Sequence, residues 1–115
     1  MQYLLMLYVN QAGWSKLTPA EQEQGVAAYS AYTGALTKAG VLKGSNRLQP
    51  TTAATTVRMA NGKAQVLDGP YADSKEHLGG YYLLDVADLD AAISWAARCP
   101  AASHGVVEVR PVWAM

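Results

Sequence analysis

The stretch from Val66 to Val86 reads Val-Leu-Asp-Gly-Pro-Tyr-Ala-Asp-Ser-Lys-Glu-His-Leu-Gly-Gly-Tyr-Tyr-Leu-Leu-Asp-Val. It begins as a strand that ends at the turn Asp68-Gly69-Pro70, and a polar segment follows. The glycine pair Gly79-Gly80 then opens an apolar run that continues to Val86. This run is apolar on both of its alternating sides, which is typical of a strand covered on both faces. The stretch therefore predicts a central strand preceded by a polar loop.

Other segments outside this stretch also have strand composition. Tyr3 to Val9 is a second continuous apolar run and predicts another central strand. Val41 to Leu48 has a polar, glycine-interrupted middle, and Val106 to Trp113 contains a proline, so both are expected at sheet edges. Thr55 to Met59 and Ala64 to Asp68 flank Asn61-Gly62, which predicts a β-hairpin.

Two helices are predicted between these strands. Thr18-Pro19-Ala20-Glu21 combines a threonine cap, a proline in the first turn and a glutamate that can complete a capping box, and the helix should run to Ala39 and stop at Gly40. Asp88 caps the second helix, which Cys99-Pro100 ends. The expected buried sides are Val26, Tyr29, Thr33 and Leu36 in the first helix and Leu89, Ala92, Ile93 and Ala96 in the second.

The order of elements predicts an α+β fold. Without the hairpin it is βαββαβ, the ferredoxin-like arrangement, with the first and third of these strands in the centre. Asn10 to Gly13 is expected to be a loop, and Trp14 beyond it either plugs the end of the core or binds a ligand. Two helices can cover only one face of the sheet, although the central strands are apolar on both. We therefore expect a homodimer in which the sheet faces pack together.

Composition limits the classes of function. A chain of 115 residues forms one domain, residues 1–115. Nine basic and nine acidic residues leave no net charge and form no basic cluster, which argues against nucleic acid as a partner. One cysteine and two histidines, none at ligand spacing, predict no disulfide, no metal site and no bound cofactor. The apolar run Leu4 to Leu7 is too short to span a membrane, so we expect a cytoplasmic protein.

Candidate site residues gather around the Asp-Gly-Pro turn. Asp68 is expected to be a turn residue that accepts backbone hydrogen bonds, an acid–base group beside a cleft, or both. Ser74, Lys75 and Glu76 form either a solvated helical turn or a ligand site. Arg58 points away from Val57, into solvent or into a cleft.

Three further side chains are weighed in the same way. The Tyr29 hydroxyl lies either in the core or in a pocket. His77 is expected to be exposed, whereas His104 stands in a loop before the last strand and is kept as a ligand-binding candidate.

These residues resemble a known family signature. Asp68-Gly69-Pro70-Tyr71 followed by Ala72 to Glu76 and Leu78 to Tyr82 is similar to the signature of the YCII-related family, also called the DGPF domain, with Tyr71 where the family has phenylalanine. The resemblance extends over nearly the whole chain, and it implies a dimeric α+β barrel and an association of some members with sigma-factor-type transcription regulators. Relatives carry a proposed catalytic histidine near the position of Tyr29, and a tyrosine there is a poor general base at neutral pH.

Three functions remain open from the sequence. The first is a small dimer that binds an unknown small organic molecule, with Asp68 as acid–base or anchoring group and with possible turnover. Its ligand-binding residues would be Tyr29, Arg58, Tyr71, Ser74, Lys75, Glu76 and His104. The second is a non-enzymatic accessory module for a transcription regulator, which predicts an exposed apolar patch and no well-formed pocket. The third is a protein that handles heme or a quinone, as other dimeric α+β barrels do.

Overall fold

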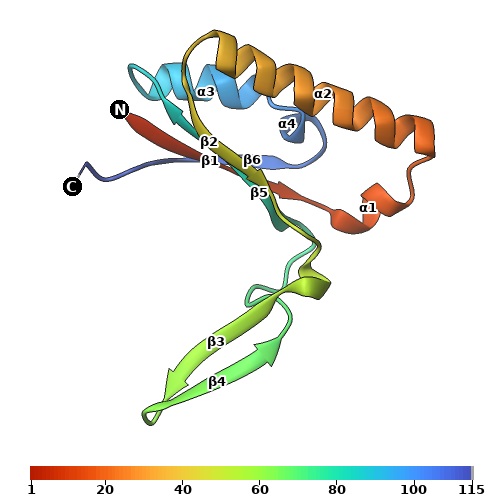
Figure 1. The fold of residues 1–115 in the computed structure, drawn as a ribbon, viewed down its shortest axis with the longest axis vertical. Helices are drawn as coiled ribbons and strands as arrows, with labels where there is room; N and C mark the ends of the chain where they lie inside the picture. Colours follow the sequence, from red (N-terminus) through yellow and green to blue (C-terminus); the bar gives the residue numbers. More distant parts are fainter. Residues whose placement is uncertain (115) are drawn as a thin grey trace.

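The computed structural model describes residues 1–114 and contains one four-stranded sheet, one separate hairpin and several helices (Figure 1). The strands are β1 (Gln2–Val9), β2 (Leu42–Arg47), β3 (Thr55–Ala60), β4 (Lys63–Asp68), β5 (His77–Asp85) and β6 (Val106–Pro111). The helices are α1 (Gln11–Ser15), α2 (Pro19–Lys38), α3 (Leu89–Arg98), α4 (Ala101–His104) and the 3-10 turn η1 (Thr51–Ala53). No helix within this described part is long and apolar enough to cross a membrane.

The sheet has the order β2-β5-β1-β6, with all neighbours antiparallel. The two strands that are apolar on both sides, β1 and β5, lie in the centre, and the polar β2 and the proline-containing β6 lie at the edges. The expected ferredoxin-like α+β fold with an extra β-hairpin is confirmed. Strand composition was sufficient for this arrangement because a central strand meets apolar neighbours on both of its faces.

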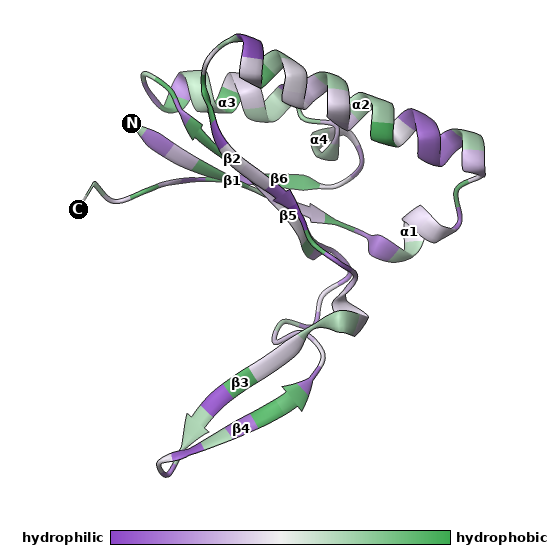
Figure 2. Cartoon of the chain, in the orientation of Figure 1, coloured by the Kyte–Doolittle hydropathy of each residue, from purple (hydrophilic) through white to green (hydrophobic). Residues whose placement is uncertain are grey.

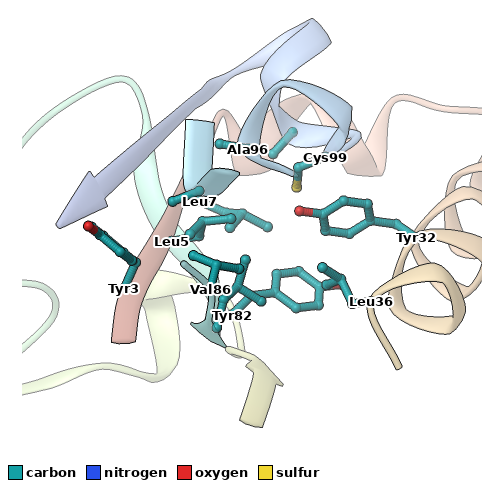
Figure 3. Packing of buried hydrophobic residues seen from close by; sticks show 12 residues of the cluster. Tyr3, Leu5, Leu7, Tyr32, Leu36, Tyr82, Val86, Ala96 and Cys99 are labelled. Carbon is teal, nitrogen blue, oxygen red and sulfur yellow. The ribbon is translucent and has the colours of Figure 1, made fainter. Parts of the chain in front are cut away.

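The core lies between one face of the sheet and the helices α2 and α3, which Figure 1 shows side by side above the strands. Leu5, Leu36 and Leu84 are completely buried there. The rings of Tyr32 and Tyr82 meet edge to face at 5.2 Å between centroids (Figure 3). The Tyr32 hydroxyl donates to the backbone oxygen of Trp95 at 2.7 Å. Aromatic contact and a satisfied hydroxyl together hold α2 and α3 on the sheet.

Helix α2 begins and ends as the sequence indicates. Thr18 accepts from the Glu21 N–H and the Glu21 carboxylate accepts from the Thr18 N–H, which completes the capping box, and Gly40 follows the helix with φ of +74°. Leu36 and Tyr32 are buried, and Tyr29 and Thr33 are partly buried, on the side that faces the sheet as expected. Val26 differs from the expectation because it is half exposed. In that first part of the helix, Gly25 lies against the Trp14 ring.

Helix α3 buries only part of its expected side. Its cap is confirmed, with Asp88 accepting from the Ala91 N–H at 2.9 Å. Ala92 and Ala96 are buried as expected, but Leu89 and Ile93 are about half exposed. The small alanine side chains let the helix backbone approach the sheet closely, and this contact is centred on Ala92, Ala96 and Cys99 rather than on the larger residues.

Three boundaries differ from the sequence expectation. Asn10 caps the short helix α1, so Trp14 lies in a helix rather than in a loop, with the Arg47 guanidinium 5.0 Å from its ring centroid. Strand β5 begins at His77, three residues before Gly80, so the glycine pair lies within the strand. Residues 71–76 are irregular and form no helical turn.

Among residues 1–114, no helix covers the face of the sheet opposite α2 and α3. We call it the open face, and cross-strand pairing places on it Leu4, Met6 and Tyr8 of β1, Tyr81 and Leu83 of β5, Asn46 of β2 and Glu108 and Arg110 of β6. Its centre is apolar and aromatic. Its edges are polar, with a Glu108–Arg110 ion pair at 2.6 Å and the Asn46 amide donating to the Tyr81 hydroxyl at 2.8 Å.

The hairpin of β3 and β4 stands away from the sheet, and we call residues 55–68 the arm (Figure 1). Asn61 and Gly62 form its tip with φ of +52° and +76°, the conformation of a type I′ turn, so the hairpin prediction is confirmed. Figure 2 shows hydrophobic segments on both strands of the arm, although no other element lies against them. The arm extends on the open-face side of the sheet, away from α2 and α3.

Candidate functional site

Two adjacent cavities, both open to solvent and the second of them shallow, lie where the arm joins the sheet. Their volumes are about 450 Å³ and about 380 Å³, within the range of small-molecule sites. They share Tyr8, Ser74 and Glu76. The first is also lined by Leu48, Gln49, Pro50, Thr51, Ala53, Ala54, Pro70, Ala72, His77 and Leu78. The second is also lined by Lys75, Val106 and Glu108.

The sheet supplies one wall of these cavities. Tyr8 lies near the end of β1 on the open face, beside a register shift between Leu7 and Tyr8 in the pairing with β5. His77 starts β5 and pairs with Val9. Glu108 on β6 pairs with Met6 and so stands on the same face. Three neighbouring strands therefore bring a hydroxyl, an imidazole and a carboxylate to one end of the sheet.

The root of the arm supplies the opposite wall. The Leu48 N–H donates to the Gly79 carbonyl at 2.9 Å, which ties the chain entering the arm to β5. The Thr51 N–H donates to the Gln11 side chain at 3.0 Å and ties η1 to α1. Because η1 and the loop around Pro70 line the first cavity, the position of the arm root determines its width.

The Asp-Gly-Pro turn holds the two arm strands together at this root. Gly69 adopts φ of +105°, a conformation that favours glycine. Its N–H donates to the Ala54 carbonyl at 2.8 Å, and its carbonyl accepts from the Thr56 hydroxyl at 2.8 Å. The structural interpretation of the glycine in this turn is confirmed. Within residues 1–114 no donor reaches the Asp68 carboxylate, so its expected backbone hydrogen bonds are not formed.

The lining of the first cavity combines apolar and polar side chains. Proline, leucine and alanine side chains form apolar walls, and Tyr8, Ser74, Glu76 and His77 present polar groups between them. A carboxylate and an imidazole are side chains commonly used in general acid–base catalysis. The Ser74 hydroxyl donates to the Glu76 carbonyl and thereby holds the segment before β5. Within the described residues, no group of three or more His, Cys, Asp or Glu side chains could hold a metal ion.

Three of the predicted site residues line these cavities. Ser74 and Glu76 contribute to both, and Lys75 contributes to the second. The polar segment before β5 therefore lies at the cavities, as its composition indicates.

The other five predicted residues line neither cavity. Asp68 is exposed at the end of β4. Arg58 lies on the arm with its guanidinium 5.8 Å from the ring centroid of Tyr71, which is itself 78% exposed. His104 is the exposed last residue of α4. The ligand-binding roles of these residues and the catalytic role of Asp68 stay predictions. Within a single protomer these residues do not share a cavity.

Tyr29 lies on the other side of the sheet from the cavities, packed on α2 against the core. Burial raises the pKa of Tyr29 to about 12, with the nearby Cys99 and Tyr82 adding to the effect and Arg47 opposing it. The raised pKa keeps the hydroxyl protonated at neutral pH, so Tyr29 does not act as a general base there. Of the two positions predicted from the sequence for Tyr29, the core is the one that it takes in the protomer.

Sequence reasoning missed Tyr8 and His77. His77 was expected to be exposed because it alternates away from Leu78, and the strand itself was predicted only from Gly80. Tyr8 was treated only as part of an apolar strand. A signal for His77 was present: a strand can continue backward through a glycine pair where neighbouring backbone comes close. A Cβ on Gly80 would lie 2.9 Å from the Asn46 carbonyl oxygen, and one on Gly79 would lie 2.9 Å from the Val9 side chain. Because these two glycines allow β5 to pair closely with its neighbouring strands, the strand can begin as early as His77.

Comparison with known proteins agrees with this fold. The 5-chloro-2-hydroxyhydroquinone dehydrochlorinase TftG from Burkholderia phenoliruptrix AC1100, solved in complex with 2,5-dihydroxybenzoquinone, superposes with a TM-score of 0.56. The alignment covers 98% of this chain and 94% of that chain at 15% sequence identity, which shows a shared fold.

Two sequence comparisons extend the relationship. An uncharacterized protein of Rhizobium meliloti (strain 1021) is 40% identical over 114 residues, which cover 97% of this chain and 92% of that protein. The sequence profile of the YCII-related domain matches residues 1–115, from the first central strand through the Asp-Gly-Pro turn to the final edge strand. The chain therefore belongs to the YCII-related domain family.

Proposed function

We propose that this protein is a homodimer that binds a small, single-ring organic molecule at the junction of arm and sheet and can move protons on it. The observation that carries the proposal is the convergence of Tyr8, Glu76 and His77 on one cavity of about 450 Å³ with apolar walls. A ring stacks or packs against such walls, while the hydroxyl, carboxylate and imidazole orient its substituents. The dehydrochlorinase that shares the fold was solved with a dihydroxylated ring, which supports this class of ligand.

The residues at the cavity have separable roles in this proposal. Glu76 and His77 are the candidate acid–base groups, because both line the first cavity. Tyr8 and Ser74 orient the ligand through their hydroxyls, and Lys75 at the second cavity attracts an anionic substituent. Asp68 does not line the cavities of its own protomer, so an acid–base role for it requires a second copy of the chain.

The dimer in this proposal pairs the open faces of two sheets. The face has an apolar centre formed by Leu4, Met6 and Leu83 and a polar edge, which is the anatomy of a protein interface. Half-buried apolar side chains on a face that no helix covers remain in contact with water in a single protomer. Pairing two such faces removes them from water and encloses the cavities between the sheets.

The two histidines of the chain test the site directly. His77 lines the first cavity, whereas His104 lies at the end of α4 outside both cavities. We expect millimolar 2,5-dihydroxybenzoquinone, or another ring from a panel with catechol and benzoate, to shift the imidazole NMR signals of His77 and leave those of His104 unchanged. The variant His77→Gln should weaken binding at least tenfold, the equivalent of about 1.4 kcal/mol, and His104→Gln should change it less than twofold.

Two results would contradict the proposal. One is the absence of any shift at His77 with the whole panel. The other is an equal loss of affinity in His77→Gln and His104→Gln, which would place the ligand elsewhere. The pair Glu76→Gln and Glu23→Gln repeats the comparison for a carboxylate, since Glu23 is exposed on α2 away from the cavities.

One observation favours the second candidate function, an accessory module for a transcription regulator. That function requires an exposed apolar patch, and one face of the arm has one: Val57, Met59 and Val66 share that face and are each exposed by more than 60%. Binding of a regulator protein through these side chains, without any ligand at His77, would support this function instead.

A further inference from the structure

The arm gains little stability from contacts with its own protomer. Its two strands, β3 and β4, form a sheet of their own and pair only with each other. Val57, Met59, Val66 and Leu67 are 61–64% exposed. A two-stranded hairpin with no third strand and no covering layer is marginally stable at best. The arm therefore needs a cover that its own protomer does not supply.

One side of the arm is apolar, and this side is defined by the pairing. Residues directly opposite each other in an antiparallel ladder share a face. One face therefore has Val57 opposite Val66, Met59 opposite Ala64 and Thr55 opposite Asp68. The other has Arg58 opposite Gln65, Ala60 opposite Lys63 and Thr56 opposite Leu67. We call the first of these, formed by Val57, Met59, Ala64 and Val66, the apolar arm face.

The amount of exposed surface indicates what covers this face. The protomer exposes 8039 Å², whereas a folded monomer of 12.3 kDa exposes about 6,100 Å². Its radius of gyration is 16.1 Å against about 13 Å for a compact chain of 115 residues. The excess of about 1,900 Å² in each of two protomers is the area that obligate homodimers bury.

The shape of the protomer fits a second copy of itself. The arm and the open face lie on the same side of the sheet, so together they form a corner (Figure 1). Each arm strand has six residues, about 20 Å in length, and a four-stranded sheet is about 19 Å wide. In a two-fold pair with facing sheets, each arm is long enough to cross the sheet of the other protomer. A chain without net charge also meets no overall repulsion from its copy.

We propose that the apolar arm face docks on a second copy of this chain, so that the two protomers clasp each other with their arms. This inference rests on the proposed dimer and adds to it the surface that stabilises it. It also explains the position of Asp68, which stands opposite Thr55 on the same face as Val57 and Val66. Docking brings the Asp68 carboxylate against the partner, so each protomer contributes this group to the neighbour's half of the dimer.

Two adjacent residues of β4 form a matched test. Val66 belongs to the apolar arm face, and Gln65 belongs to the opposite face. Both are exposed in the protomer, so an aspartate at either position leaves the protomer's own core intact. Sedimentation equilibrium over a dilution series should show a wild-type dimer, a dissociation constant at least tenfold higher for Val66→Asp, and a change of less than twofold for Gln65→Asp. Met59→Asp and Ala60→Asp repeat the comparison on β3.

The outcomes separate the arm from the rest of the proposal. A wild-type dimer that Val66→Asp and Gln65→Asp weaken equally would overturn arm docking and leave the sheet-to-sheet dimer standing. A wild-type protein that is monomeric at every concentration would overturn both arm docking and the sheet-to-sheet dimer. The NMR shifts of His77 would still test ligand binding independently. Far-ultraviolet circular dichroism of each variant confirms that the sheet and helices are retained, so that a weaker dimer reports the interface.

Discussion

The backbone packs so closely around Gly105 that there is no room for a side chain at this position. A Cβ at this position would lie 2.3 Å from the Tyr8 carbonyl oxygen and 3.3 Å from that of Ala101. Both are backbone atoms, which cannot move aside as the end of a flexible side chain can. Gly34, on the exposed side of α2, has no heavy atom within 4 Å of its Cβ position.

These two glycines should therefore respond in opposite directions to the same substitution. Gly105→Ala is expected to lower the free energy of unfolding by about 1–3 kcal/mol, as overpacking does. Gly34→Ala is expected to raise it by up to about 1 kcal/mol because alanine favours a helix. Urea unfolding at one fixed protein concentration measures both. A Gly105→Ala variant as stable as the wild type would show that the strand ends are not in close contact.

The buried tyrosines predict how stability depends on alkaline pH. The pKa of Tyr29 is raised to about 12 by burial, and burial also raises the pKa of Tyr32. In the unfolded chain a tyrosine loses its proton near pH 10. Between pH 10 and 12 the folded state therefore binds more protons than the unfolded state, and the free energy of unfolding falls as the pH rises.

We expect Tyr29→Phe to remove part of this fall. The variant should lose about 1–2 kcal/mol less stability than the wild type between pH 9.5 and 11.5, because phenylalanine has no proton to lose. The control is Tyr71→Phe. Because Tyr71 is 78% exposed, the stability of this variant should depend on pH as that of the wild type does. Identical pH profiles for Tyr29→Phe and the wild type would mean that Tyr29 is not buried in solution.

At the scale of elements, the capping box of α2 is the clearest local signal in the chain. The Thr18 hydroxyl accepts from the Glu21 N–H at 3.2 Å, and the Glu21 carboxylate accepts in return from the Thr18 N–H at 2.9 Å. Thr18→Ala should lower the free energy of unfolding by about 1 kcal/mol. Ser30→Ala, at an exposed position in the middle of the same helix, should be neutral or slightly stabilising. Equal effects of the two substitutions in urea unfolding would argue against the cap.

Elements with strong local signals could be predicted from the sequence. The caps at Thr18 and Asp88 determine where two helices begin, and the Asn-Gly pair determines the arm tip. The short helices α1 and α4 could not be predicted, since five and four residues contain too few turns for an apolar repeat. The start of β5 was also missed, because glycines were treated as a boundary when they in fact permit close strand pairing.

Part of the site could be predicted for the same reason. Ser74 and Glu76 are in a polar segment whose composition is visible in the sequence, and they line both cavities. Tyr8 and His77 are brought to the cavity by strand pairing between residues nearly 70 positions apart. No local pattern records such a pairing. The position of Asp68 outside the cavities likewise depends on the direction in which the whole arm leaves the sheet.

At the scale of the whole molecule, the open face follows from the sequence, and the detached arm does not. The central strands are apolar on both sides, and α2 and α3 cover one side only, as the count of helices implies. The hairpin was expected as an addition to the fold, but nothing in its residues shows that it leaves the sheet. Only the structure reveals it: Val57 and Val66 are both more than 60% exposed, whereas a hairpin packed on its own sheet would bury one of them.

The place of the cavities has a consequence for how ligand and partner act on each other. One wall of the first cavity comes from Tyr8, His77 and Leu78 of the sheet, and the other from Thr51, Ala54 and Pro70 at the arm root. A partner that holds the arm in one position also sets the distance between these walls. If the ligand binds best when the arm is in that position, ligand binding and dimerisation are coupled. The ligand then raises the affinity between two protomers by the same factor by which the partner raises the affinity for the ligand. Raising the ligand concentration and raising the protein concentration then both shift the protein toward the liganded dimer.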